Sequence, residues 1–187
     1  MKKLMQNRVA CWAFSLLGLL TINASAQDDK ANRPSPPDEV SGTVEGADIT
    51  INYSQPSVKG REIFGELVPY GEVWRTGANE ATTFEVSSDV EIEGKALPAG
   101  KYALFTIPTE DEWTVIFNKA PEQWGAFNYD EAQDALRVEV TPEDTSEPAE
   151  MLTFEIGDNG EVTMMWADTS VSFEVASAGQ ASSADQE

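Results

Sequence analysis

Alternation of apolar and polar residues dominates the chain between about residues 39 and 176. In each short stretch the apolar side chains take every second position, and mostly Thr, Glu, Ser, Asp, Asn or Arg stand between them. A period of two places the two kinds of side chain on opposite faces of a β-strand. The apolar positions are Ile49, Ile51 and Tyr53; Phe84 and Val86; Val90 and Ile92; Leu136, Val138 and Val140; Leu152, Phe154 and Ile156; Val162, Met164 and Trp166; and Val171, Phe173 and Val175.

Two further stretches, residues 102–107 and 113–117, are almost continuously apolar and predict central strands buried on both faces. Turn-forming residues separate the strands at hairpin spacing, at 93–95, 98–100, 157–160 and 168–170. No apolar helical period extends beyond a turn or two. We therefore predict an all-β fold, an antiparallel β-sandwich of jelly-roll or immunoglobulin-like type with about nine or ten strands.

Two long connections interrupt this pattern, one from Ser54 to Thr82 and one from Asn118 to Asp134. Connections of more than about 12–15 residues are uncommon in compact domains and are often functional. Both contain several aliphatic and aromatic side chains, so we expect two long ordered loops packed on the sandwich.

The two ends of the chain have a different composition from the strands. Residues 1–26 combine Lys2, Lys3 and Arg8, an apolar stretch and the sequence Ala24-Ser25-Ala26, which predicts a signal peptide cleaved after Ala26. The predicted location is therefore secreted or periplasmic, without membrane insertion after cleavage. Residues 27–38 and 177–187 are polar and predict a disordered linker and a disordered tail around a domain at 39–176.

The chain is strongly acidic. It has 12 Lys plus Arg against 33 Asp plus Glu, a formal net charge of −21, and three of those cations belong to the predicted leader. Nucleic acids and anionic membranes require basic surfaces, so no nucleic acid is expected as a partner. Because salt screens the repulsion between like charges, this composition also suggests halophilic adaptation; ordinary solubility charge is the alternative.

Missing residue types exclude several kinds of chemistry. The chain has no histidine, and its single cysteine, Cys11, lies in the predicted leader. Thiolate nucleophiles, imidazole bases and the usual zinc, copper and iron sites are therefore not expected, and we predict no cofactor, no metal and no catalytic residue of these kinds. Residues 158–161 fit a hairpin turn better than a calcium loop. Paired carboxylates remain available for hydrolysis.

The first long connection carries three cations among several glycines. Lys59, Arg61 and Arg75 stand there with Trp74, Asn79 and Glu80, and such a set can bind a carboxylate, phosphate or sulfate. The structural alternative is that Arg75 pairs with Glu80 or Glu72 and that Arg61 pairs with another acid, which would fix the loop geometry.

The second long connection has the composition of a sugar-binding platform. Trp124, Asn128 and Tyr129, together with Gln123 and Phe127, offer flat apolar faces and amide groups. The alternative is that the rings anchor this connection to the core. If the two connections meet at one end of the sandwich, they form a single site.

Three stretches resemble a secreted bacterial family catalogued as domain of unknown function 2911. They are YSQPSVKGREIFGELVPYGEVWRTGANEATTFE (53–85), PAGKYALFTIPTEDEWTVIFNK (98–119) and QWGAFNYDEAQDALRVEV (123–140). The resemblance covers about residues 41–176 and implies a cell-envelope or extracellular setting, but it implies no activity. The residues that it carries over, without catalytic roles, are Lys59, Arg61, Trp74, Arg75, Asn79 and Glu80.

These observations favour a non-catalytic secreted β-sandwich that binds a small polar ligand, a glycan or a protein partner through its two long connections. A carboxylate-dependent hydrolase acting on envelope polysaccharide is the second hypothesis. A purely structural envelope protein, in which the connections are braced by their own side chains, is the third.

Overall fold

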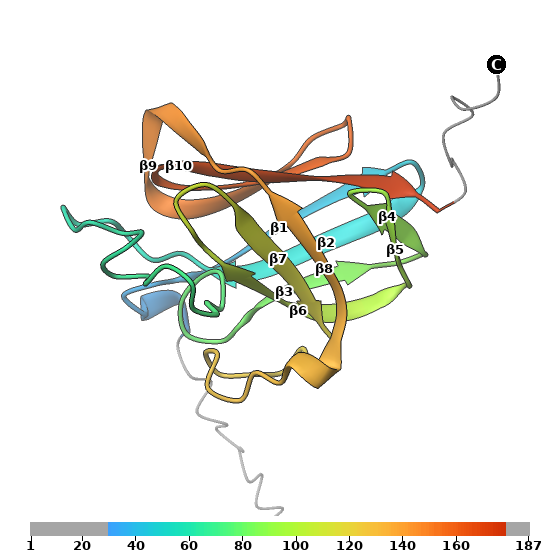
Figure 1. Cartoon of the computed structure of the whole chain (residues 1–187), viewed down its shortest axis with the longest axis horizontal. Coiled ribbons are helices and arrows are strands. Elements are labelled where there is room, and N and C mark those ends of the chain that lie inside the picture. Colours follow the sequence, from blue (N-terminus) through green and yellow to red (C-terminus); the bar gives the residue numbers. More distant parts are fainter. Residues whose placement is uncertain (1–29, 179–187) are drawn as a thin grey trace, which may run out of the picture.

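The computed structural model describes residues 30–178, which form ten β-strands and two short 3₁₀-helices. The strands build two antiparallel sheets that pack face to face (Figure 1), so the predicted all-β sandwich is confirmed. The predicted signal peptide and residues 179–187 of the predicted tail lie outside the described residues. Within residues 30–178, no helix is long and apolar enough to cross a bilayer.

Each sheet is built mainly from hairpins between neighbouring strands. The larger sheet contains, in spatial order, β1 (Pro37–Val44), β2 (Ala47–Ser54), β3 (Thr82–Val86), β6 (Gly100–Ile107), β7 (Trp113–Asn118) and β8 (Asp134–Val140). The smaller sheet contains, in spatial order, β5 (Lys95–Leu97), β4 (Val90–Ile92), β10 (Glu161–Ser177) and β9 (Glu143–Ile156). The 3₁₀-helices are η1 (Lys30–Asn32) and η2 (Glu131–Gln133).

The core lies between the two sheets, where the alternating apolar residues of both inner faces meet. Phe117 of β7 contacts Phe84 of β3 at a ring-centroid distance of 5.2 Å and Phe173 of β10, in the opposite sheet, at 5.7 Å. Each fully buried side chain of this kind contributes about 1.5–3 kcal/mol. Because the folded part of the chain has no cysteine, stability depends on this packing rather than on disulfide bonds.

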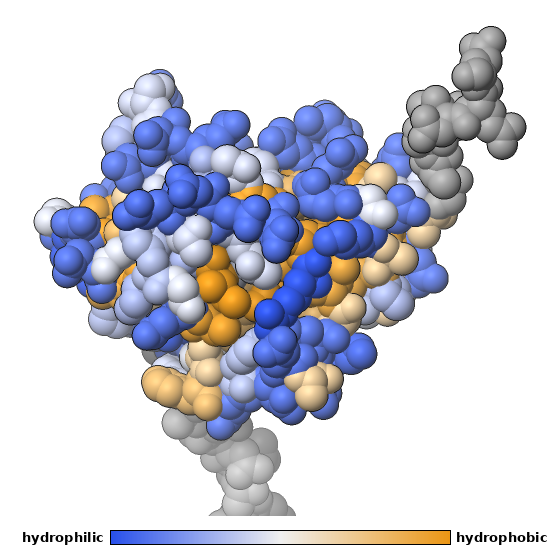
Figure 2. Space-filling model, in the orientation of Figure 1, coloured by the Kyte–Doolittle hydropathy of each residue, from blue (hydrophilic) through white to orange (hydrophobic). Residues whose placement is uncertain are grey.

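The two nearly continuous apolar stretches are buried on both faces, as predicted. Phe105 of β6 and Ile116 of β7 point away from the main core and form a second cluster with Ala81 and Ala103 on the outer face of the larger sheet. Residues of the connection between β7 and β8 cover this cluster. Figure 2 shows hydrophilic residues over much of the face in view, with hydrophobic residues exposed across its middle and at its lower and right edges.

The predicted turn at residues 168–170 is wrong. β10 continues through this position, and its pairing with β9 shifts register between Met165, Ala167 and Thr169. Ala167 has a positive φ of 55°. A bulge of this type leaves residues unpaired within a continuous strand, so polar residues gather there without ending it.

The structure also differs from the prediction at the N-terminal side of the domain. Residues 30–38, expected to belong to a disordered linker, form η1 and the start of β1. Their order comes from contacts with residues far along the chain, such as the ion pair of Arg33 with Glu80 and the hydrogen bond from the Gln55 N–H to the Pro36 carbonyl. Composition alone does not reveal such partners.

The turn of the β9–β10 hairpin depends on a glycine. Gly160 has a φ of 89°, and an added Cβ would lie 2.3 Å from the Val175 carbonyl oxygen. Gly46, with a φ of 91°, has open space around that position. Both alanine substitutions impose the strain of positive φ, about 1–2 kcal/mol, but only Gly160→Ala must also move backbone, which costs about 1–3 kcal/mol more. Urea unfolding of the two variants measures the difference, and equal losses would contradict the close approach.

Candidate functional site

A cavity of about 310 Å³ lies beside the first connection, residues 55–81. The residues around it come mostly from that connection, with one residue from β10 and one from the N-terminal segment. They are Ser35, Pro56, Arg61, Leu67, Val68, Pro69, Glu72, Val73, Trp74, Arg75, Gly77, Ala78 and Trp166. In Figure 1 the first connection, coloured teal to green, lies at the left of the sandwich.

The first connection is held in place by an added strand-like contact. Trp74 and Thr106 exchange backbone hydrogen bonds of 2.8 and 2.9 Å, which continue the pairing along β6 past the point where β3 begins. The Thr76 hydroxyl contacts the Thr106 hydroxyl at 3.1 Å, and the Thr82 hydroxyl donates to the Thr76 carbonyl at 2.7 Å. These buried bonds fix the backbone on both sides of Arg75.

Aromatic packing fixes the side of the connection that faces the core. The Trp74 ring stacks on the Trp166 ring with centroids 5.7 Å apart and an interplanar angle of 16°. Phe64, also in the first connection, lies edge-on to Trp113 at 4.8 Å. Offset stacked and edge-to-face ring pairs stabilise by about 0.5–1.5 kcal/mol each beyond their burial. The cavity wall that includes Trp74 is therefore rigid.

Arg75 is one of the residues that line this cavity; it is half-buried, and its guanidinium has no protein partner. Its Nε atom is buried and has no hydrogen-bond partner, and no carboxylate among residues 30–178 forms an ion pair with its guanidinium. Burial lowers the pKa of Arg75 from its ordinary value because the charged form loses water. Glu72 lines the same cavity but does not pair with Arg75. The alternative in which Arg75 pairs with Glu80 or Glu72 is therefore wrong.

Arg61 has a different environment from Arg75. Its Nε donates to the Val58 carbonyl at 3.0 Å, and its second terminal nitrogen donates to the Ser57 carbonyl. Arg61 therefore braces the start of the first connection through backbone carbonyls rather than by pairing with an acid. It lines both this cavity and a neighbouring one of about 520 Å³, which also includes Phe64, Tyr70 and Asp168.

Trp166 lines the cavity, although its place in the alternating pattern predicts only a core residue. Its ring is 1% exposed, and its indole nitrogen is buried without a hydrogen-bond partner. A buried indole N–H group usually has a hydrogen-bond acceptor. In the sequence, Trp166 follows Val162 and Met164 on one strand face, which is otherwise aliphatic. This tryptophan is the one signal in the sequence that could have indicated a site.

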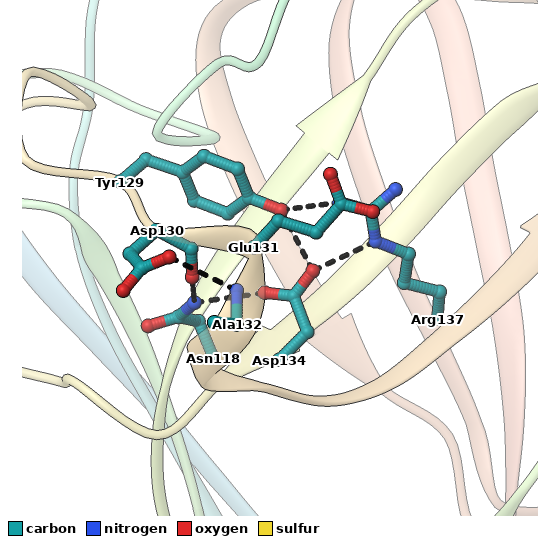
Figure 3. Close-up of polar contacts among 7 residues, drawn as sticks. All are labelled: Asn118, Tyr129, Asp130, Glu131, Ala132, Asp134 and Arg137. Carbon is teal, nitrogen blue, oxygen red and sulfur yellow. Dashed lines mark hydrogen bonds and ion pairs between the residues drawn. The ribbon is translucent and has the colours of Figure 1, made fainter.

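A polar network around Tyr129 anchors the end of the second connection, residues 119–133, that leads into β8 (Figure 3). The Tyr129 hydroxyl donates to Asp134 at 2.7 Å, and Arg137 donates to the same carboxylate at 2.7 Å and to the Tyr129 oxygen. Burial and the bond to Asp134 raise the pKa of Tyr129 to about 12. The Tyr129 ring also packs on Phe105 at 5.1 Å, so neither its face nor its hydroxyl is available.

The remaining aromatic residues of the second connection are exposed. Trp124 is 55% exposed, with the Arg33 guanidinium 5.8 Å from its ring centroid, and Phe127 is 83% exposed. Asn128 is exposed as well. None of these three residues lines the cavity that contains Arg75.

The two connections meet through their backbones. The Ala81 N–H donates to the Gln123 carbonyl at 2.9 Å, and the Gly125 N–H donates to the Asn79 carbonyl at 3.0 Å. The contact places the connections side by side but does not join their candidate side chains in one cavity. Within the described part of the chain, no cluster of three or more acidic residues is arranged to hold a metal ion.

A family model described as "Protein of unknown function (DUF2911)" matches residues 35–175, which is most of the chain. The chain belongs to this family. No curated protein and no solved structure matches it. For the DUF2911 domain, the geometry of the cavity is therefore the main guide to function.

The six residues carried over from the DUF2911 resemblance fall into separate groups. Arg61, Trp74 and Arg75 line the cavity. Asn79 and Glu80 hold the N-terminal segment: the Asn79 amide donates to the Ser35 carbonyl at 3.0 Å, and Glu80 is bound by that segment's two cations. Lys59 is exposed, and its backbone N–H donates to the Glu150 side chain at 2.9 Å.

Glu80 is the electrostatic anchor of the N-terminal segment in this DUF2911 domain. It accepts from Lys30 at 2.9 Å and from Arg33 at 2.9 Å. Burial alone would raise the pKa of Glu80, but the bonds from Lys30, its own backbone N–H and Arg33 outweigh burial and lower the pKa to about 2. Ser35, which belongs to the same segment, forms part of the cavity wall.

Glu80→Gln tests this anchor through pH. Because the folded pKa is lowered from 4.5 to about 2, ionised Glu80 stabilises the fold above pH 4.5, and this contribution disappears as pH falls toward 2. We expect the variant to be less stable than the parent at neutral pH and equal to it near pH 2, as measured by urea unfolding. Glu85→Gln, which breaks the exposed pair with Lys101, is the control and should have a smaller effect. Equal effects of the two variants would contradict the anchor.

Comparing the stabilities of variants at Arg137 and Arg75 shows whether Arg75 stabilises the fold or is left free for a ligand. Arg137→Met removes the cation paired with Asp134 and should reduce the free energy of unfolding by about 1–3 kcal/mol. Arg75→Met keeps the apolar stem and removes a buried charge that has no partner, so stability should stay equal or rise. Thermal and urea unfolding measure both changes. A loss at Arg75 as large as that at Arg137 would show that Arg75 braces the fold.

Proposed function

We propose that this DUF2911 chain is a non-catalytic, secreted or periplasmic protein that binds a small polar ligand in the cavity beside the first connection. The observation that carries this proposal is the half-buried Arg75 guanidinium, which has no acceptor among the described residues. Of the three other charged candidates, Arg61 and Glu80 are already bound by protein groups, and Lys59 is exposed away from this cavity.

An unpaired buried charge is costly. Desolvation penalises the cation, and an unmade hydrogen bond in a buried site costs about 1–3 kcal/mol. Such groups concentrate at functional sites, because a ligand that supplies the missing acceptor recovers the lost energy on binding. The rigid aromatic wall lowers the entropy cost of binding further, since little of the site must be ordered when a ligand arrives.

Hydrolysis is less well supported than binding. A carboxylate mechanism needs two acidic groups on either side of the scissile bond. Glu72 is the one acidic residue among those that line the cavity. The purely structural hypothesis accounts for Asn79 and Glu80, which brace the N-terminal segment, but leaves the unpaired Arg75 without a role.

A ligand screen on residues 27–187 tests the proposed function. The screen measures the melting temperature with small anions, neutral polar molecules and glycans, at low and at high salt. We expect at least one class to raise the melting temperature of the parent and to have no effect on Arg75→Met, because the variant lacks the unpaired donor. Screening at both salt concentrations also tests halophilic adaptation, since added salt alone should stabilise residues 27–187, whose formal net charge is −21 − 3 = −24 without the three leader cations. Responses that persist unchanged in Arg75→Met would contradict this site.

A further inference from the structure

We infer that an oligosaccharide carrying a uronic acid binds where the two connections meet, with its carboxylate on the terminal nitrogens of Arg75 and a sugar ring against Phe127 and Trp124. This inference rests on the proposed function, because it takes Arg75 as the donor that lacks a protein partner. It goes further by naming the ligand class and by extending the site from the cavity to the surface of the second connection. We call the two exposed rings, Trp124 and Phe127, the aromatic shelf.

The side chain of Arg75 reaches from the cavity to the second connection. Arg75 lines the cavity, and its Nη1 atom lies 3.6 Å from the position that a Cβ on Gly125 would take. Among residues 30–178, the buried side-chain atoms without a partner include Arg75 Nε but neither terminal nitrogen, and the Arg75 side chain forms no hydrogen bond or ion pair. Nη1 and Nη2 are therefore accessible and unpaired. A ligand at the junction can bind this end of the guanidinium without entering the core.

The accessible end of Arg75 favours an acidic group. Guanidinium nitrogens donate hydrogen bonds and do not accept them, and their planar fork matches the two oxygens of a carboxylate. Arg33, the other arginine beside this turn, is already compensated by Glu80. Arg75 therefore carries the uncompensated positive charge of the junction. A carboxylate forms charge-assisted hydrogen bonds with it, which are about twice as strong as those of a neutral hydroxyl.

Exposed aromatic rings stand beside this guanidinium. The Phe127 ring lies 3.0 Å from the same Cβ position on Gly125, so the ring and Arg75 Nη1 border the same point of the turn. Phe127 is 83% exposed, and Trp124, which directly precedes Gly125, is 55% exposed. The Arg33 guanidinium lies 5.8 Å from the Trp124 ring centroid, and such a cation–π contact favours one ring position. Flat apolar rings next to polar donors suit a sugar, which has apolar C–H faces and polar edges.

The turn that carries the shelf is held at both ends. The Gly125 N–H donates to the Asn79 carbonyl at 3.0 Å, which ties the turn to the first connection. The fully buried Asn118 donates to the Asp130 carbonyl at 3.0 Å and accepts from the Ala120 N–H at 3.1 Å. The rings are therefore carried by an ordered turn, and less entropy is lost when a ligand binds them.

The size of the shelf favours a short oligosaccharide over a protein partner. Because a whole Phe or Trp side chain buries about 150–250 Å², the exposed parts of the two rings offer roughly 300 Å². A stable protein interface needs about 800 Å² from each partner. The exposed acids Glu122 and Asp130 are close to the rings in sequence and limit the apolar area. In Figure 2, hydrophobic residues are exposed at the lower edge of the molecule, where Figure 1 places the second connection in yellow.

Calorimetric titration of residues 27–187 with uronate trimers tests the ligand class. Trimers of galacturonate and of mannuronate are each compared with their methyl esters, which keep the sugar rings and remove the charges, and with inorganic phosphate and sulfate. We expect at least one trimer to bind roughly 10–100-fold more tightly than its ester, because hydrogen bonds to charged groups are the stronger ones. Equal affinity of trimer and ester, or tighter binding of an inorganic anion, would overturn the class.

Variants of the chain test the two parts of the site separately. Arg75→Met should lose roughly the same 10–100-fold factor, and Phe127→Ala should bind the trimer about 3–10-fold more weakly because it lacks the ring contact. Tyr70→Ala removes a 40% exposed ring beside the neighbouring cavity and should leave the affinity unchanged. Binding that requires Arg75 but is equal in the parent and Phe127→Ala would restrict the ligand to the cavity and overturn the shelf.

A spectroscopic readout locates the ligand on the unmodified protein. In ¹H–¹⁵N spectra, the assigned indole N–H resonance of Trp124 should shift on addition of the trimer. The indole resonance of Trp113, which is 1% exposed, is the internal control and should stay in place. A bound trimer that leaves the Trp124 resonance unchanged would contradict a sugar ring against this side chain.

Other outcomes separate the ligand class from the proposed function. If the trimers fail to bind while another small polar compound shows a response that depends on Arg75, the proposed function stands and the uronate class is wrong. If no compound shows a response that depends on Arg75, both are overturned. Sedimentation velocity should show a monomer; a dimer that Phe127→Ala dissociates would show that the shelf binds a second copy of the chain, and would overturn the glycan ligand.

Discussion

The stacked contact between Trp74 and Trp166 is the interaction on which the candidate site depends. It joins the first connection to β10, across the interior of the sandwich, with ring centroids 5.7 Å apart. Together with the backbone pairing of Trp74 with Thr106, it fixes residue 74 from two directions. Arg75 follows directly in sequence, so its half-buried position is imposed by the packing of its neighbour.

The sequence predicted those features that depend on local pattern. The period-two stretches became strands, and the continuously apolar stretches 102–107 and 113–117 became β6 and β7, buried on both faces. The local pattern gave a wrong prediction where the structure is decided by contacts between residues far apart in the sequence. Residues 168–170 combine turn-forming types, but pairing with β9 keeps them inside β10. Residues 30–38 are polar and proline-rich, yet Glu80 and Asn79 order them.

The candidate site shows the same limit more sharply. The composition of the first connection indicated an arginine-bearing loop, and Arg61, Trp74 and Arg75 do line one cavity. The sequence could not show that Glu80 binds Lys30 and Arg33 and so leaves Arg75 unpaired. It also could not show that Trp166, apparently an ordinary core residue, lines the same cavity. Tyr129 illustrates the opposite case, since its ring and hydroxyl are both used by the fold.

The central claim is that Arg75 has no protein acceptor and is available to a ligand. A high-resolution crystal structure of residues 27–187, grown without small carboxylates in the buffer, measures this most directly. The account predicts that any atom within hydrogen-bond distance of Arg75 Nε belongs to a water or another non-protein molecule. A carboxylate or carbonyl oxygen of the protein bonded to Arg75 Nε would contradict it.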